Sequence, residues 1–583
     1  MRRAPWLALA AWCAATAADK GADDEILRAM RDELARSRTL KIQGTDQIYY
    51  IEYALDDVES FSATASMGAL VSSSRARNRV PRVQVRVGDA SFDNTNYVFA
   101  DFFGRVNSRI PVEANYPVVR HQFWLATDRV FKGSLESIAR KRSALRNVTQ
   151  HEKLNDFAKA EPVQMYLEPS RRVWKEAEWT KLARDLSAIF VKYPKVTSSQ
   201  VEIEIAYSNS YYVNSEGSEF RMPDDMFFVR VRASAQARDG MPVRDADAAH
   251  ARTLGRLAGE AELRAMVERV ARNVTAMLDA AAGEDYAGPV LFEDAAAPQL
   301  FAQVLGSNLA PVRRPVSEPG RTFPVMQSEL EGRIGSRVLP EWMDVVDDPE
   351  SQEWKGRELL GSYPVDMEAV VPRRLAVVEK GVLTHYLLTR QPVRGFEGSN
   401  GRARLPGDFG AKRAVFSNLL VTAREASPAA ELKRKLIEMV NQRGKPYGMI
   451  VRKIDLPSSG SGEEQRRLSA AAGQRGGSLR PTSLPLLAWR VYPDGREEMV
   501  RGVKFRGLTA RSLRDIVAAS DAPSAFDFIG NGSPLPVMGA GGYVATHTVV
   551  APAVLFEDLE LEKREEDWPK LPVVEPPPLV SSR

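Results

Sequence analysis

Cysteine and histidine are scarce in this 583-residue sequence, which contains one cysteine and five histidines. A single cysteine excludes a disulfide framework and any zinc module that relies on several cysteines. Five histidines leave few soft ligands for a transition metal. Long continuous apolar runs are also lacking beyond the N-terminus, so we predict no integral membrane span.

Charge of one sign does not dominate either. The chain has 80 Lys and Arg against 76 Asp and Glu, which gives a formal net charge of +4. These charges are interspersed without a basic stripe, so we predict no nucleic-acid partner. The hydrophobic fraction of 44% and the charged fraction of 27% are typical of a globular protein and exclude a mostly disordered chain. The length predicts about two to four domains.

The first eighteen residues have the pattern of a signal peptide. Arg2 and Arg3 precede the short apolar run of residues 4–17, and the small residues at 15–17 form a typical cleavage pattern. We therefore predict an exported protein, either periplasmic or extracellular. Because Cys13 lies in this segment, the mature chain is expected to contain no cysteine.

The N-terminal half predicts helices combined with antiparallel strands. A first region, 19–150, has helical patterns at 24–37 and 118–146 and strand patterns at 47–55 and 82–88. A second region, 151–284, repeats this order. It has a helix through Trp179 and Leu186, a hairpin over 199–235 with a polar turn at 214–217, and a long helix over 260–279.

From residue 285 the sequence favours strands and turns over helices. Residues 285–562 contain many short β-like runs and one clear helix at 428–443, which predicts a large, mostly β domain. Residues 457–484 are rich in Ser, Gly and Arg and predict a mobile insertion, and 563–583 form a Pro-rich tail. The overall fold class is therefore predicted to be α+β.

Several short motifs occur in an order that is similar to that of a known family. They are Asn-Ser-Glu-Gly at 214–217, the segment 288–297, Val-Val-Asp-Asp-Pro at 345–349, the segment 379–386, Asn-Gly-Arg at 400–402 and Leu-Pro-Val at 535–537. In these motifs and their spacing, the chain resembles the TldD/PmbA family of metallopeptidase-related proteins, also called the modulator of DNA gyrase family. The resemblance covers residues 40–562 and implies an α/β N-terminal region followed by a mostly β C-terminal domain.

The sequence departs from this family at every zinc ligand that the resemblance implies. Active members have a His-Glu-x-x-x-His helix and a late cysteine, in which the glutamate acts on zinc-bound water. Here Phe292 stands at the first histidine, Glu293 at the glutamate and Ala297 at the second histidine, and 526–537 contains no cysteine. Phenylalanine and alanine cannot bind a metal, so the predicted zinc motif is degenerate, with no catalytic residue, no metal and no cofactor.

Other residues do not obviously rebuild a metal site. No two of the five histidines lie three to five residues apart, as local zinc pairs do; they are His121, His151, His250, His385 and His547. Asp347, Asp348 and Glu350 could hold a hard cation, but we interpret them as a solvated turn.

Three functions follow from these observations. The first is a non-catalytic family member, a pseudopeptidase that binds a peptide or an unfolded protein segment, alone or as a homo- or hetero-dimer with a catalytic family member. Asn400, Gly401 and Arg402 are its candidate peptide-binding residues, by resemblance. The second is an active zinc metallopeptidase whose ligands lie elsewhere, and the third is a hydrolase built on carboxylates such as Glu293 and Asp294.

Overall fold

The computed structural model describes residues 24–98, 110–113, 115–146, 153–318, 327–404, 412–455, 482–529, 546–565 and 568–569. The predicted signal peptide, the 535–537 turn and nearly all of the predicted insertion and tail lie outside the described residues. Among the described helices, none combines the length and the apolar character needed to cross a membrane.

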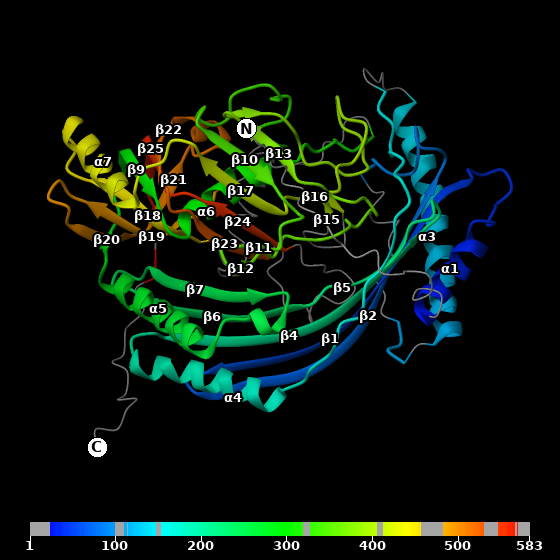
Figure 1. The fold of residues 1–583 in the computed structure, drawn as a ribbon, viewed down its shortest axis with the longest axis horizontal. Helices are drawn as coiled ribbons and strands as arrows, with labels where there is room; N and C mark the ends of the chain where they lie inside the picture. The colour runs from blue at the N-terminus through cyan, green and yellow to red at the C-terminus, as the bar shows by residue number, and fades with distance from the viewer. Residues whose placement is uncertain are drawn as a thin grey trace, which may run out of the picture.

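One long, curved sheet organises the N-terminal half (Figure 1). Its seven strands are β1 (Ile48–Ser66), β2 (Ala69–Val87), β3 (Gln164–Tyr166), β4 (Ser198–Asn214), β5 (Glu219–Pro223), β6 (Met226–Gln236) and β7 (Pro242–Ala251). The order is β2-β1-β4-β5-β3, with β6 beside β4 and β7 beside β6. Because β1 pairs with β4 from Glu52–Asn214 to Ala65–Val201, a single sheet runs through both predicted N-terminal regions.

Alternation along β1 sends its two faces to different partners. Tyr53 and Phe61 point to the same face of the sheet. Tyr53 packs under the helices α1 (Glu25–Ser37) and α3 (Tyr116–Leu145). Phe61 packs under the helices α4 (Glu176–Ser187) and α5 (Glu260–Asp279). Short 3-10 segments, η1 (Ala188–Lys192) and η2 (Leu254–Arg256), flank these helices. The opposite face turns toward the C-terminal half, where Glu52 pairs with Lys412. Figure 1 shows the C-terminal half seated over this face.

The C-terminal half consists mainly of two sheets. The eight-stranded sheet contains β8 (Ala281–Ala282), β9 (Tyr286–Phe292), β18 (Gly448–Ile454), β19 (Pro485–Val491), β20 (Glu497–Arg501), β21 (Val503–Arg506), β22 (Ile516–Ala519) and β25 (Val554–Lys563). The six-stranded sheet contains β10 (Met343–Asp347), β13 (Leu375–Glu379), β14 (Val382–Leu383), β17 (Asn418–Ala423), β23 (Ser524–Ile529) and β24 (Thr546–Ala551). Two small ribbons are formed by β11 (Glu353–Trp354) with β12 (Arg357–Glu358) and by β15 (Ala403–Arg404) with β16 (Arg413–Ala414).

A buried helical run lies between these sheets and positions the candidate site. It comprises α6 (Ala296–Leu300), the π-helix η3 (Phe301–Leu305) and the 3-10 helix η4 (Gly306–Asn308). Its apolar side chains share one core with strands of both sheets. Among the described residues, the C-terminal half also contains the helix α7 (Ala429–Gln442) and the 3-10 helix η6 (Ala510–Asp515).

These elements confirm the predicted α+β class and most of the predicted helices. The helix predicted at 24–37 is α1, whose first turn is capped by Asp24 through bonds from the amides of Ile26 and Leu27 at 3.0 and 3.1 Å. The hairpin predicted over 199–235 has its turn at Asn214, but the returning chain forms two strands, β5 and β6. The break falls at the residues between them, where the Asp225 carboxylate accepts a bond from the Ser208 amide at 2.9 Å.

Candidate functional site

Phe292 is the last residue of β9 and is fully buried. It lies opposite Val451 of β18 and Val554 of β25, and its ring packs against Phe505 and Phe556 at centroid distances of 5.6 and 5.5 Å. The position that the resemblance assigns to a first zinc histidine therefore holds an apolar core side chain on a strand. Phe292 and Ala297 do not lie on one helix, as the two histidines of the family's zinc motif do, because α6 begins only at Ala296.

Ala297 lies in the first turn of α6, where all five side chains are buried. The chain reaches this helix through Asp294, whose φ of 51° lies in the left-handed region. Pro298 is the third residue of α6, in the first turn, where its missing N–H costs little. The second predicted ligand position is thus a methyl group packed between the two sheets.

Glu293 lies between β9 and α6, and its side chain is held by an ion pair. Its backbone amide donates to the Val451 carbonyl at 3.0 Å, which continues the β9–β18 ladder by one bond. Its Oε1 accepts a bond from Nε of Arg452 at 2.6 Å. The Glu293 and Arg452 side chains are 22% and 26% exposed, so this pair lies at the rim of the core.

Arg452 links Glu293 to a longer chain of alternating charges. Its second guanidinium nitrogen donates to Glu497 at 2.8 Å, and Nζ of Lys433 donates to the other oxygen of Glu497 at 2.6 Å. The guanidinium also lies over the ring of Trp489, 4.4 Å from its centroid. Burial raises the pKa of Glu293, and the bond and charge of Arg452 oppose this rise.

The histidines do not supply a metal site among the described residues. His385 is exposed and bonds the Ala376 carbonyl at 3.0 Å, while His547 is buried and bonds the Phe416 carbonyl at 2.8 Å. Burial lowers the pKa of His547 to about 3 and that of His250 to about 4. His121 stacks edge-on with Trp124 of α3.

The remaining predicted histidine, His151, lies outside the described residues. Across the described ranges, no three His, Cys, Asp or Glu side chains are grouped so as to hold a metal ion. In the segment 292–297, Phe292 and Ala297 carry no atom that can bind a metal, so the side chains at these two positions do not fit zinc.

The three carboxylates at the end of β10 and in the loop after it each bind protein donors. The interpretation as a solvated turn is wrong for Asp347 and Asp348, which are both buried: Asp347 is held by groups from distant segments, and Asp348 by amides of its own loop. Asp347 pairs with Arg402 at 2.7 Å, and Asp348 accepts bonds from the amides of Glu350 and Ser351 at 3.0 and 3.1 Å. Glu350 pairs with Arg373 at 2.9 Å on the surface.

The Asn-Gly-Arg segment is held by bonds to the surrounding backbone. Asn400 accepts from the Leu388 amide at 2.8 Å and donates to the Tyr386 carbonyl at 2.7 Å. Gly401 has a φ of +78°, and a Cβ there would lie 2.7 Å from Cα of Pro372.

Arg402 is almost fully buried and completes this loop. Besides Asp347, its guanidinium binds the Arg373 carbonyl at 2.6 Å. Asn400, Gly401 and Arg402 thus fix the loop in place, and their contact with a peptide stays a prediction.

Sequence reasoning missed Arg452, Glu497, Lys433 and Trp489. The available signal is the charge of Arg452 directly after the apolar segment 449–451 of β18, because a charged side chain in a largely buried strand requires a partner. Which carboxylates pair with it depends on long-range contacts that neither periodicity nor motif spacing specifies.

Known proteins share both sequence and fold with this chain. Residues 285–451 match the family model described as the PmbA/TldA metallopeptidase C-terminal domain. A protein named "Metalloprotease" from Archaeoglobus fulgidus is 33% identical over 78 residues, which are 13% of this chain and only 17% of that protein.

Two solved structures share the overall fold. One, described as a candidate modulator of DNA gyrase from Thermotoga maritima, has a TM-score of 0.55 and 16% identity over 92% of this chain and 99% of its own. The other, TldE from Thermococcus kodakarensis, has a TM-score of 0.55 and 12% identity over 92% of this chain and 100% of its own. Identities this low establish the fold alone. The match at 285–451 supports a relation of this part of the chain to the TldD/PmbA family of metallopeptidase-related proteins.

Proposed function

We propose that this chain is an exported, non-catalytic family member that binds a peptide or an unfolded protein segment. The observation that carries the proposal is how the side chains of the segment 292–297 are packed and paired. Phe292 and Ala297 are packed into the core, and Glu293 is paired with Arg452 at 2.6 Å.

This arrangement does not suit a metal-assisted peptidase. The glutamate of such an enzyme takes a proton from water whose pKa a metal has lowered, and it must face that water. Here one Glu293 oxygen faces a guanidinium that is also tied to Glu497. The segment 530–545, which includes most of the late-cysteine region, contains no His, Cys, Asp or Glu.

The proposed place for the peptide is a sheet edge beside this segment. Among the described strands, β23 lies at one end of the six-stranded sheet, and Oγ of Ser524 at its start donates to the carbonyl of Asp294 at 2.6 Å. An extended peptide can add to such an edge through main-chain bonds. It would then run past Glu293 without meeting a catalytic group. A second copy of this chain or a catalytic family member is the proposed partner.

Metal content and peptide binding test the proposal together. The protein is purified from its native envelope without a metal-affinity tag, its N-terminus is sequenced, and bound zinc is measured by elemental analysis. We expect cleavage near residue 18, less than about 0.1 zinc per chain, and no hydrolysis of a fluorescein-labelled neutral decapeptide that nevertheless binds in anisotropy titrations. Stoichiometric zinc with hydrolysis would establish an active peptidase instead.

A matched pair of variants locates the binding. Glu293→Gln removes the charge beside β23 and should leave the affinity for the neutral peptide within about twofold, because main-chain bonds dominate such binding. Phe526→Lys changes a half-buried side chain of β23 and should weaken binding, since it alters the surface that the peptide covers. If both variants bound the neutral peptide with equal affinity, the proposal that the peptide binds at the edge of β23 would be wrong.

A further inference from the structure

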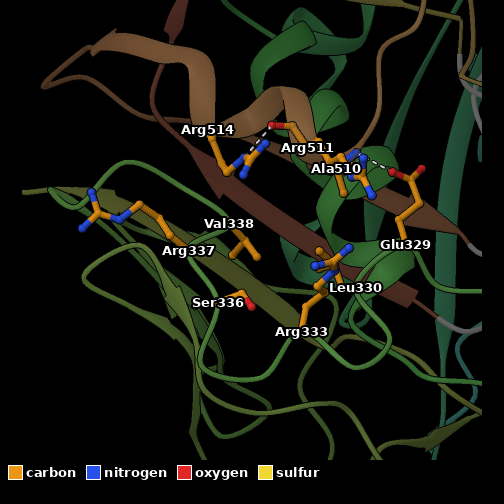
Figure 2. A pocket seen from close by; sticks show the side chains of 9 residues that line it. All are labelled: Glu329, Leu330, Arg333, Ser336, Arg337, Val338, Ala510, Arg511 and Arg514. Atoms are coloured by element: carbon orange, nitrogen blue, oxygen red, sulfur yellow. Dashed lines mark hydrogen bonds between the residues drawn. The ribbon is translucent and has the colours of Figure 1, made fainter.

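A pocket of about 290 Å³ lies between the loop that precedes β10 and the helix η6 (Figure 2). Four arginines line it, Arg333 and Arg337 from the loop and Arg511 and Arg514 from η6. Leu330 and Val338 add apolar side chains to its wall. The pocket therefore combines several positive groups with a small apolar surface.

Three of these arginines have unused binding capacity. Arg337 pairs with Glu341 at 3.2 Å, in a contact where both side chains are more than half exposed. Within the described parts of the chain, no ion pair joins Arg333, Arg511 or Arg514 to a carboxylate; Nε of Arg514 donates only to the Arg511 carbonyl at 3.3 Å. Positive charge thus exceeds the negative charge available to balance it.

Among the described residues that line the pocket, the one carboxylate, that of Glu329, binds a backbone amide. Oε2 of Glu329 accepts the amide of Ala510 at 2.9 Å, at the first turn of η6 (Figure 2). An amide at a helix start is an ordinary partner for a carboxylate. Glu329 therefore helps to fix η6.

The backbone that carries the arginines is fixed on both sides. The amide of Glu329 donates to Asn308 at 3.0 Å, which ties the loop to the end of the buried helical run, and the amide of Arg333 donates to the Tyr386 hydroxyl at 3.1 Å. On the other side, Thr509 and Ser512 form a capping box at the start of η6. A ligand would therefore pay little to order the backbone of the site.

We infer that this pocket binds an acidic peptide segment through its carboxylates. Guanidinium groups pair with carboxylates through two parallel bonds, and Figure 2 shows the four arginines spread around the pocket, with Arg337 pointing away from the other three. Such spacing suits a ligand with several separate carboxylates better than a single compact anion. The inference rests on the proposed peptide-binding function and specifies which peptides are preferred.

Two labelled hexapeptides test the preference. Their sequences are Glu-Ala-Glu-Glu-Ala-Glu and the same peptide with each Glu replaced by Gln, and binding is followed by fluorescence anisotropy at ~50 and ~300 mM salt. We expect the acidic peptide to bind about tenfold more tightly at low salt, with most of this advantage lost at high salt. Equal affinity of the two peptides would overturn the inference.

Two triple variants with the same loss of charge assign the site. Arg333, Arg511 and Arg514 are all exposed, so changing all three to Ala should preserve the fold while weakening the acidic peptide about tenfold. The control changes three exposed arginines of α5, Arg264, Arg269 and Arg272, to Ala and should stay within about twofold of the parent. Equal losses in both triple variants would reduce the effect to net charge and contradict the site.

Three further outcomes distinguish this inference from a small-anion site and from the proposed peptide binding itself. If inorganic phosphate displaces the acidic peptide at equal concentration, the pocket is a small-anion site and the inference is wrong. If the neutral decapeptide binds but acidic peptides gain nothing, the acidic preference fails while the proposed peptide binding survives. If neither binds, the proposed function itself fails.

Discussion

Two arginine–carboxylate pairs in the C-terminal half have nearly the same bond length but different surroundings. Asp347 and Arg402 meet at 2.7 Å with side-chain exposures of 0% and 1%. Glu293 and Arg452 meet at 2.6 Å with exposures of 22% and 26%. The distance alone does not distinguish them. Burial and the number of additional bonds do.

The difference shows that ion pairs of equal length can serve either the stability of the core or a site at the protein surface. Asp347 also accepts the Ser417 amide at 2.6 Å, and Arg402 binds backbone carbonyls from two segments, so both charges are fully satisfied without water. Glu293 and Arg452 instead form part of a partly exposed chain of charges that runs from the residue after β9 to β18 and on to Glu497 of β20. We therefore assign a structural role to the first pair and place the second at the candidate site.

Breaking the buried pair should have the largest effect. Arg402→Ala leaves Asp347 as an uncompensated buried charge and should lower the free energy of unfolding by about 3–5 kcal/mol, measured by chemical denaturation. The control Arg434→Ala changes a side chain that is 67% exposed and should cost at most about 1 kcal/mol. Similar losses in the two variants would contradict the structural role of Arg402.

A buried carboxylate without a cationic partner extends the comparison. Asp366 accepts three backbone amides, from Glu368, Val370 and Ala403 at 2.8–2.9 Å, and no ion pair to it is found among the described residues. Burial, followed by the nearby charge of Glu368, raises the pKa of Asp366 to about 7.

This raised pKa predicts how stability depends on pH. Since the folded pKa exceeds the ordinary value of 3.8, the folded state binds more protons, and stability should fall by about 2–4 kcal/mol as pH rises from about 4 to 7. Asp366→Asn should flatten this slope in denaturation curves recorded at several pH values, whatever its absolute stability. An unchanged slope would show that Asp366 is not the group responsible.

The half-exposed pair should give the smallest effect. Arg452→Met keeps an apolar stem over Trp489 but removes the bonds to Glu293 and Glu497, and it should cost about 1–2 kcal/mol. Arg452→Lys serves as a control because it keeps the charge while losing the second bond. If Arg452→Met lowered the free energy of unfolding by more than about 3 kcal/mol, the Glu293–Arg452 pair would be as important for stability as the buried pair, which would contradict the comparison.

Local patterns in the sequence predicted much of the secondary structure. The apolar stripe of α5 begins and ends where the pattern over 260–279 does, and the helix at 428–443 appears as α7, because each helix has one buried face. The pattern over 199–235 does not predict that the returning chain forms two strands, because this depends on the pairing of β4 with β5 at one end and with β6 at the other.

The candidate site was less predictable because the residues that bond to one another there are distant in sequence. The motif at 288–297 drew attention to Glu293, but its partner Arg452 lies on β18, and Glu497 lies on β20. Likewise, the Asn-Gly-Arg motif marks a loop but does not reveal that Arg402 is buried against Asp347. Such pairs follow from strand order, which single-sequence patterns do not determine.

The position of β9 has a consequence for synthesis. This strand lies between β18 and β25, so its two neighbours come from residues 448–454 and 554–563. At ~5–20 residues per second, on the order of 10–50 s pass between the emergence of Phe292 and that of β25. During that interval one edge of β9 has no native partner, and an unpaired apolar edge is prone to intermolecular association. A nascent chain arrested before residue 554 should therefore need a chaperone or remain unfolded in its C-terminal half.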